Sequence, residues 1–111
     1  MLARKFRLNS EREFKKIFSR GRYISGNFIT IKYYFHNALE NPKIGVVVSK
    51  KISNKATVRN KLKRQINEVI YSVVDKIGKS LEIVIIVKKI ADDFTLLRED
   101  IINSLRKGKM I

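Results

Sequence analysis

The chain has 111 residues, the length of one ordinary domain with a modest core. It carries 25 Lys and Arg residues against 10 Asp and Glu residues, a formal net charge of +15, and 44% of its residues are hydrophobic. The hydrophobic content excludes a disordered tail, and the absence of cysteine excludes a disulfide framework, a thiolate metal site and a Cys nucleophile. A folded chain with this charge indicates an anionic partner, either a phosphate backbone or an acidic membrane surface.

Targeting and membrane signals are not found in the sequence. The N-terminal residues MLARKFRLNSEREF lack the apolar core of a secretion signal, and apolar runs such as Ile83–Val87 are too short to cross a bilayer. Together with the missing cysteines, these features predict a cytoplasmic protein that does not bind membranes.

The N-terminal part of the sequence predicts a helix, a strand and a turn. Ser10, followed three residues later by Glu13, is a capping-box pattern that opens a helix, and Gly21 ends it. β-Branched and aromatic residues predict a strand over Phe28–Phe35, and a turn over His36–Pro42 follows.

The remaining elements follow in the order strand, helix, strand, helix. The wholly apolar run Ile44–Val48 predicts a short strand covered on both faces. An apolar stripe at helical spacing predicts a helix over Val58–Ile77, and a second apolar run predicts a strand over Glu82–Ile90. Phe94–Leu105 is predicted to be the last helix, and the tail Lys107–Ile111 is expected to be loose.

This order of elements predicts the fold class. A strand, a helix and a strand between Ile44 and Val87 indicate a parallel βαβ unit, because parallel strands need a crossover connection. We therefore expect a single α+β domain over residues 1–111. It would be an α-β sandwich, with one layer of helices on a mixed sheet of about four strands.

Basic residues are concentrated in one segment. Between Lys43 and Asn67 there are eight Lys or Arg residues and no acid. A charge run is often only a solvated face, but a solvated helix usually mixes signs to gain i,i+4 pairs. Here the cations crowd a helix N-terminus, where the helix dipole disfavours them unless an anion binds. Amide groups at a helix start, together with Lys and Arg side chains, form a phosphate site.

The periodicity of this helix predicts which polar side chains point outward. Asn60, Lys61 and Arg64 point away from the apolar stripe, whereas Arg59 and Lys63 lie at its border. The helix is therefore predicted to hold RNA backbone on one flank and to direct Lys63 towards a neighbouring groove.

Two aromatic residues on the first helix permit two interpretations. Phe14 and Phe18 lie one turn apart, on the same face as Ile17, which is the usual arrangement of core residues. Alternatively, the edges of their rings line a groove in which single-stranded bases stack.

The basic segment contains a recognisable motif. The run VSKKISNKATVRNKLKRQI resembles the signature of the protein subunit of bacterial ribonuclease P. The core of that signature is Arg-Asn-x-x-Lys-Arg, which here falls on Arg59, Asn60, Lys63 and Arg64. A Ser-Lys-Lys element precedes it at Ser49–Lys51, and a Phe-x-x-x-Phe followed by Gly, at Phe14, Phe18 and Gly21, also resembles the family. The similarity covers nearly the whole chain.

The resemblance implies a function. In this family the partner is the ribozyme that removes 5′ leaders from precursor tRNA, and metal ions, usually Mg²⁺, do the chemistry with the RNA. The protein resembles a clamp whose basic helix lies on the catalytic RNA and whose groove, between the sheet and the first helix, holds the leader. By this resemblance, the residues that serve mainly the ribozyme RNA are Lys50, Lys51, Arg59, Asn60, Lys61 and Arg64. Those that face the leader are Phe14, Phe18 and Lys63.

Further expectations come from the same resemblance. It implies a rare left-handed βαβ crossover, a protein without catalytic residues of its own, and no stable protein partner. The sequence departs from the family pattern at Lys61, where Arg is common, and at Asn67, near which another basic residue is often found. A strand position that is aromatic in some members resembles Ile31 here, with Tyr33 two residues along.

Three other functions compete with this interpretation. A non-catalytic RNA-binding module of ribosomal-protein type would have the same composition and basic helix. A stand-alone nuclease would need clustered carboxylates, whereas the acids here are scattered along the chain and the adjacent pair Asp92 and Asp93 suits a helix N-cap. The lone His36 is expected at the surface of a turn and not in catalysis. A membrane-surface helix is disfavoured because its apolar stripe must cover the sheet.

Overall fold

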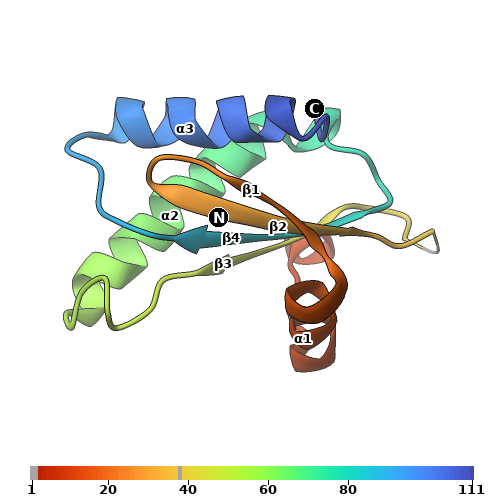
Figure 1. Cartoon of the computed structure of the whole chain (residues 1–111), viewed down its shortest axis with the longest axis horizontal. Coiled ribbons are helices and arrows are strands. Elements are labelled where there is room, and N and C mark those ends of the chain that lie inside the picture. The colour runs from red at the N-terminus through yellow and green to blue at the C-terminus, as the bar shows by residue number, and fades with distance from the viewer. Residues whose placement is uncertain (1–2, 38) are drawn as a thin grey trace.

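Four strands form one mixed sheet at the centre of the fold (Figure 1). In spatial order they are β1 (Arg22–Ser25), β2 (Ile29–Phe35), β4 (Leu81–Val87) and β3 (Lys43–Val47). β2 pairs antiparallel with both β1 and β4, whereas β3 pairs parallel with β4. The structure, a computed structural model, describes residues 3–37 and 39–111.

Helices connect and cover these strands. They are the α-helices α1 (Glu11–Arg20), α2 (Ala56–Val73) and α3 (Phe94–Lys107), and the short 3-10 helices η1 (Arg4–Phe6) and η2 (Val74–Lys76). Because α2 connects the parallel strands β3 and β4, the predicted βαβ unit is confirmed, and so is the α+β class with helices on a mixed four-stranded sheet. The left-handed sense of the crossover stays a prediction. No helix in residues 3–37 and 39–111 combines the length and apolarity that a membrane crossing requires.

The predicted helix ends are set by local hydrogen bonds. The Ser10 hydroxyl accepts a bond from the Glu13 amide at 3.4 Å, and the Gly21 amide donates to the Ile17 carbonyl. Asp93 caps α3 by accepting a bond from the Leu96 amide at 2.9 Å, which confirms its predicted capping use. Only the serine half of the capping box is seen, because the Glu13 side chain turns towards the sheet.

Helices cover both faces of the sheet, so the prediction of a single helix layer is wrong. Ile83 and Ile85 of β4 belong to the main core cluster, which α2 and α3 complete. Between them, Val84 points to the opposite face and packs in a smaller cluster with Ile17 of α1. Figure 1 shows α1 on the side opposite α2 and α3. β4 is apolar on both faces because each face is covered by helices.

The C-terminal tail is packed, contrary to the expectation that it is loose. Met110 is only 2% exposed and belongs to the main core cluster. Its amide donates to the Leu105 carbonyl, and its carbonyl accepts a bond from the Gly78 amide. Burial of the Met110 side chain therefore holds a segment whose composition alone suggests fraying.

One buried carboxylate joins the β1–β2 turn to α3. Asp100 is 8% exposed, and its two oxygens accept bonds from the amides of Asn27 (2.8 Å), Phe28 (2.8 Å) and Ile29 (3.2 Å). A Cβ atom on Gly26 would come within 2.7 Å of these oxygens, so glycine is needed there for the close approach. The turn that carries β1 is thus held by a side chain more than 70 residues away in the sequence.

Candidate nucleic-acid interface

The outer side of α2, with the loop before it, carries a dense group of cations. The residues of α2 that are buried against the sheet are Leu62, Ile66, Val69, Ile70 and Val73. Those exposed on α2 and the loop are Lys50, Lys51, Lys55, Asn60, Lys61, Lys63 and Arg64. The predicted orientation of Asn60, Lys61 and Arg64 away from the apolar stripe is confirmed, because the sheet takes the other side of the helix.

Arg59 differs from its neighbours in being half-buried. Its Nη1 donates to the carbonyl oxygen of Ser53 at 2.9 Å, across the loop that precedes the helix. This residue therefore shapes the loop between Ser49 and the helix start while part of its guanidinium remains accessible.

Acidic residues do not neutralise this surface. The ion pairs seen between two described residues, Lys15–Glu11 and Lys16–Glu13, both lie on α1. α2 begins after the N-cap residue Lys55, which makes no side-chain capping bond, and no acid lies in its first turn. The start of α2 thus combines amide dipoles with lysine charges, the arrangement that binds phosphate.

A groove of about 270 Å³ follows the outer edge of β3, between α1 and α2. Its lining residues are Arg7, Leu8, Phe14, Ile44, Gly45, Val46, Lys63 and Asn67. The Phe14 ring rests on β3, where a Cβ atom on Gly45 would come within 2.6 Å of the ring. Glycine at this position therefore provides the space for the ring. The predicted burial of β3 on both faces is only partly correct, since Val46 and Val47 are half-buried beside the groove.

The groove continues onto α2. A second hollow of about 560 Å³ is lined by Thr57, Asn60, Lys63, Arg64 and Asn67. Lys63 and Asn67 line both hollows, so the basic face of α2 and the groove beside Phe14 form one continuous surface. The prediction that Lys63 reaches a groove next to the helix is confirmed.

Part of the sheet face beside α1 is left open. On this face one row of neighbouring residues, Lys32, Val84 and Gly45, runs across β2, β4 and β3. The next row, Thr30, Ile86 and Val47, is only half-buried, although Ile86 and Val47 pack against the cluster that contains Ile17 and Val84. These side chains form a shallow apolar strip next to the helix.

The two phenylalanines lie in different surroundings. Phe14 is half-buried against β3, whereas Phe18 is 42% exposed and has the Lys32 Nζ 4.9 Å from its ring centre. Phe18 does not line the groove at β3. The shared helix face predicted for the two rings therefore leads to two environments, because α1 runs across the strands.

Ile31 and Tyr33 are buried on the opposite face of β2, at 0% and 9% exposure. They belong to the core shared with α2 and α3, and neither faces the groove. Lys32 and Thr30, the alternate residues of the strand, face α1 instead. Ile31, which stands at the strand position that is aromatic in some family members, therefore contributes no side chain to the groove.

Comparison with known proteins decides the family of this chain. The sequence profile of the family described as Ribonuclease P matches residues 2–109. The chain belongs to the ribonuclease P protein family. It is 31% identical to the ribonuclease P protein component of a Pseudanabaena species, over 100% of this chain and 97% of the relative. It is 35% identical to that of Caldanaerobacter subterraneus, over 91% of this chain and 87% of the relative.

A solved structure agrees with this assignment. The ribonuclease P protein from Thermotoga maritima is similar with a TM-score of 0.81 and 31% identity, covering 91% of this chain and 96% of that one. This protein is therefore a component of ribonuclease P, the endoribonuclease of tRNA 5′ maturation, which implies an RNA subunit as partner. The resemblance seen in the basic motif is confirmed at the level of the family.

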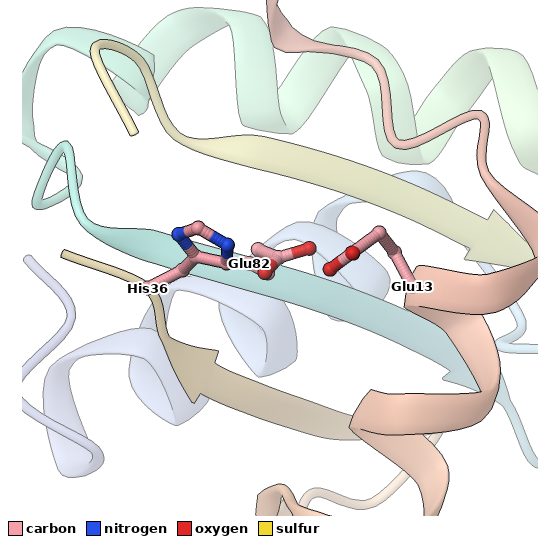
Figure 2. Close-up of side chains that lie close together, drawn as sticks. All are labelled: Glu13, His36 and Glu82. Carbon is pink, nitrogen blue, oxygen red and sulfur yellow. The ribbon is translucent and has the colours of Figure 1, made fainter. Parts of the chain in front are cut away.

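One group of metal-ligand side chains is found among the residues that the structure describes. Glu13, His36 and Glu82 bring their ligand atoms within 4.8 Å of one another (Figure 2). His36 was expected at the surface but is half-buried beside these carboxylates. Sequence reasoning missed the group because its members come from α1, the end of β2 and β4, which only the strand pairing brings together.

The ribonuclease P family is metal-dependent, so the fit of this group to Mg²⁺ matters. Mg²⁺ prefers six oxygen ligands and keeps several waters, which usually leave room for a substrate phosphate. The group here includes an imidazole, and Glu82 is only 1% exposed. These residues do not fit a hydrated Mg²⁺ that acts on RNA.

Proposed function

We propose that this protein binds the catalytic RNA of ribonuclease P with the basic face of α2 and holds the 5′ leader of precursor tRNA in the groove beside Phe14. The observation that carries the proposal is the continuity of the two surfaces through Lys63. Under this proposal the contacts to the catalytic RNA come from Lys50, Lys51, Arg59, Asn60, Lys61 and Arg64. The contacts to the leader come from Phe14, Phe18 and Lys63.

Charge and shape assign different parts of the RNA to the two surfaces. The α2 face offers cations and helix-start amides, which bind phosphates whatever the base sequence. The groove offers the Phe14 ring, an apolar strip and one lysine, which suit unpaired bases with a flanking phosphate. Phe18, with Lys32 above its ring, extends the second surface along α1.

The remaining parts of the proposal concern the working complex. We propose that Mg²⁺ ions bind mainly to the RNA and that the 1–111 chain acts as a single RNA-binding domain. It works in the cytoplasm without a stable protein partner. The absence of cysteine agrees with a reducing compartment.

Purified protein without RNA is expected to leave precursor tRNA uncut. Adding the ribonuclease P RNA of the same organism should yield cleavage at the mature 5′ end. The reason is that the basic surface has no clustered carboxylates, and its polar groups position phosphates without activating water. The measurement is gel analysis of 5′-labelled precursor tRNA with protein alone, RNA alone and both, in Mg²⁺ buffer. Accurate 5′ cleavage by protein shown to be free of RNA would contradict this function.

Arg64→Ala is expected to weaken binding to the catalytic RNA and to flatten its salt dependence. Each lost phosphate contact lowers the slope of log affinity against log salt by about 0.7–0.9. Arg59→Ala and Lys61→Ala should act in the same direction. Binding is measured by filter retention or fluorescence anisotropy across a range of KCl concentrations.

Lys76→Ala serves as the matched control for this series, because Lys76 is an exposed lysine in η2, which follows the far end of α2. Its slope should remain that of the unmodified protein. If the slopes of all three motif variants also remain unchanged, α2 is not the contact surface. The stability of Arg59→Ala is also measured by denaturant unfolding, because Arg59 donates a hydrogen bond to the Ser53 carbonyl and so holds the loop.

A further inference from the structure

Three side chains of metal-ligand type meet beneath the first turn of α1. Glu13 comes from α1, His36 directly follows β2, and Glu82 lies on β4. Figure 2 shows the Glu82 carboxylate between the His36 ring and the Glu13 carboxylate. A cavity of about 240 Å³, also lined by Ser10, Leu39 and Lys43 among others, opens onto them.

Polar atoms of this group are enclosed without partners. Three polar atoms are shielded from solvent and have no hydrogen-bond partner among the residues that the structure describes. They are Glu82 Oε1, Glu13 Oε2 and His36 Nδ1. The Glu82 residue is only 1% exposed. A buried carboxylate oxygen without a partner is strongly unfavourable unless a proton or a cation compensates it.

Neighbouring lysines do not fill this role for Glu82. Lys43 Nζ donates to the Lys5 carbonyl at 2.6 Å. Lys16 Nζ lies 4.6 Å from the centre of the Tyr34 ring and 3.8 Å from Glu13 Oε2, so it compensates Glu13 in part. Arg7 also lines the cavity, at its exposed side. Glu82 Oε1 thus remains buried without a hydrogen-bond partner among the residues that the structure describes.

We propose that Glu13, His36 and Glu82 bind one Zn²⁺ ion, which links α1 to β4 and the end of β2. An imidazole with two carboxylates is a donor set that Zn²⁺ accepts, whereas Mg²⁺ and Ca²⁺ prefer oxygen alone. The cavity that opens onto the three side chains leaves room for a water molecule as a fourth ligand. Zn–N and Zn–O distances are about 2.0–2.2 Å, so an ion would draw together ligand atoms that already lie within 4.8 Å of one another.

The two carboxyl groups of this cluster lie close enough to influence each other. Burial raises the pKa of Glu82 to about 7, and the adjacent Glu13 carboxyl adds to the shift.

Bound zinc would hold the part of α1 that carries Phe14. Glu13 is followed directly by Phe14, whose ring lines the groove at β3. An ion that fixes the first turn of α1 to the sheet also fixes the position of this ring. The site itself does not depend on RNA binding, so it can be tested on the protein alone.

The test uses the full chain, stripped with EDTA and dialysed at pH 8. Equilibrium dialysis followed by metal analysis should find one Zn²⁺ per chain. Circular dichroism melts at a zinc concentration about 100-fold above Kd should show a Tm about 10 °C higher than in EDTA. Glu82→Gln and His36→Gln should each lose about tenfold or more in zinc affinity, together with the Tm shift.

Glu11→Gln is the matched control, because Glu11 lies on the same helix with its side chain 86% exposed. It should bind zinc as the unmodified protein does. Metal-free Glu82→Gln is expected to fold, since it removes a buried charge, and His36→Gln carries the test if it does not. The proposal is overturned if zinc leaves the Tm of the unmodified protein unchanged, or if the ligand variants respond to zinc as Glu11→Gln does.

Discussion

Phe14→Leu is expected to weaken binding of precursor tRNA to the holoenzyme while leaving binding of mature tRNA unchanged. Loss of base stacking on the ring accounts for about 1–3 kcal/mol per base, which is about 5- to 150-fold in Kd. Leucine keeps most of the packing against Gly45 and removes the aromatic face. Only an RNA with a 5′ leader can reach the groove, so only that RNA should lose affinity.

Controls separate this effect from a general loss of structure. Phe94→Leu, in half-buried surroundings on α3, should change neither affinity. Phe18→Leu should show the same leader-specific loss with little change in the free energy of unfolding, because the ring is 42% exposed. If Phe14→Leu weakens the binding of precursor and mature tRNA equally and also lowers the free energy of unfolding, the role of this residue is purely structural.

Asp100→Ala is expected to lower the free energy of unfolding by about 3–4 kcal/mol, because three amides of the β1–β2 turn lose their acceptor. Urea unfolding followed by circular dichroism measures the change at constant m-value.

Two further variants define this effect. Glu99→Ala, an exposed acid one position earlier on α3, should stay within about 0.5 kcal/mol of the unmodified protein. Asp100→Asn should fall between them, since one amide oxygen can still accept. A loss below about 1 kcal/mol for Asp100→Ala would mean that water replaces the carboxylate at the turn.

Local signals in the sequence were sufficient to predict the three α-helices and to recognise the family. Ser10 and Asp93 cap their helices through bonds within three residues, and the apolar stripe of α2 fixes which side its cations occupy. The Arg-Asn-x-x-Lys-Arg motif is contiguous, so its resemblance needed no tertiary information. These features depend on neighbours along the chain, which periodicity and spacing report directly.

Strand pairing decided what the sequence alone could not. β1 was not predicted, because RYIS is short and mostly exposed and becomes a strand by pairing with β2. The pairing of β2 with β4 aligns Phe35 with Leu81, which brings His36 close to Glu82 although they are distant in sequence. α1 crosses the sheet on its second face, and so separates Phe14 from Phe18. Such contacts depend on the strand register and on the burial of both faces of β4. The hydrophobic periodicity of one segment does not indicate which other segment packs against it.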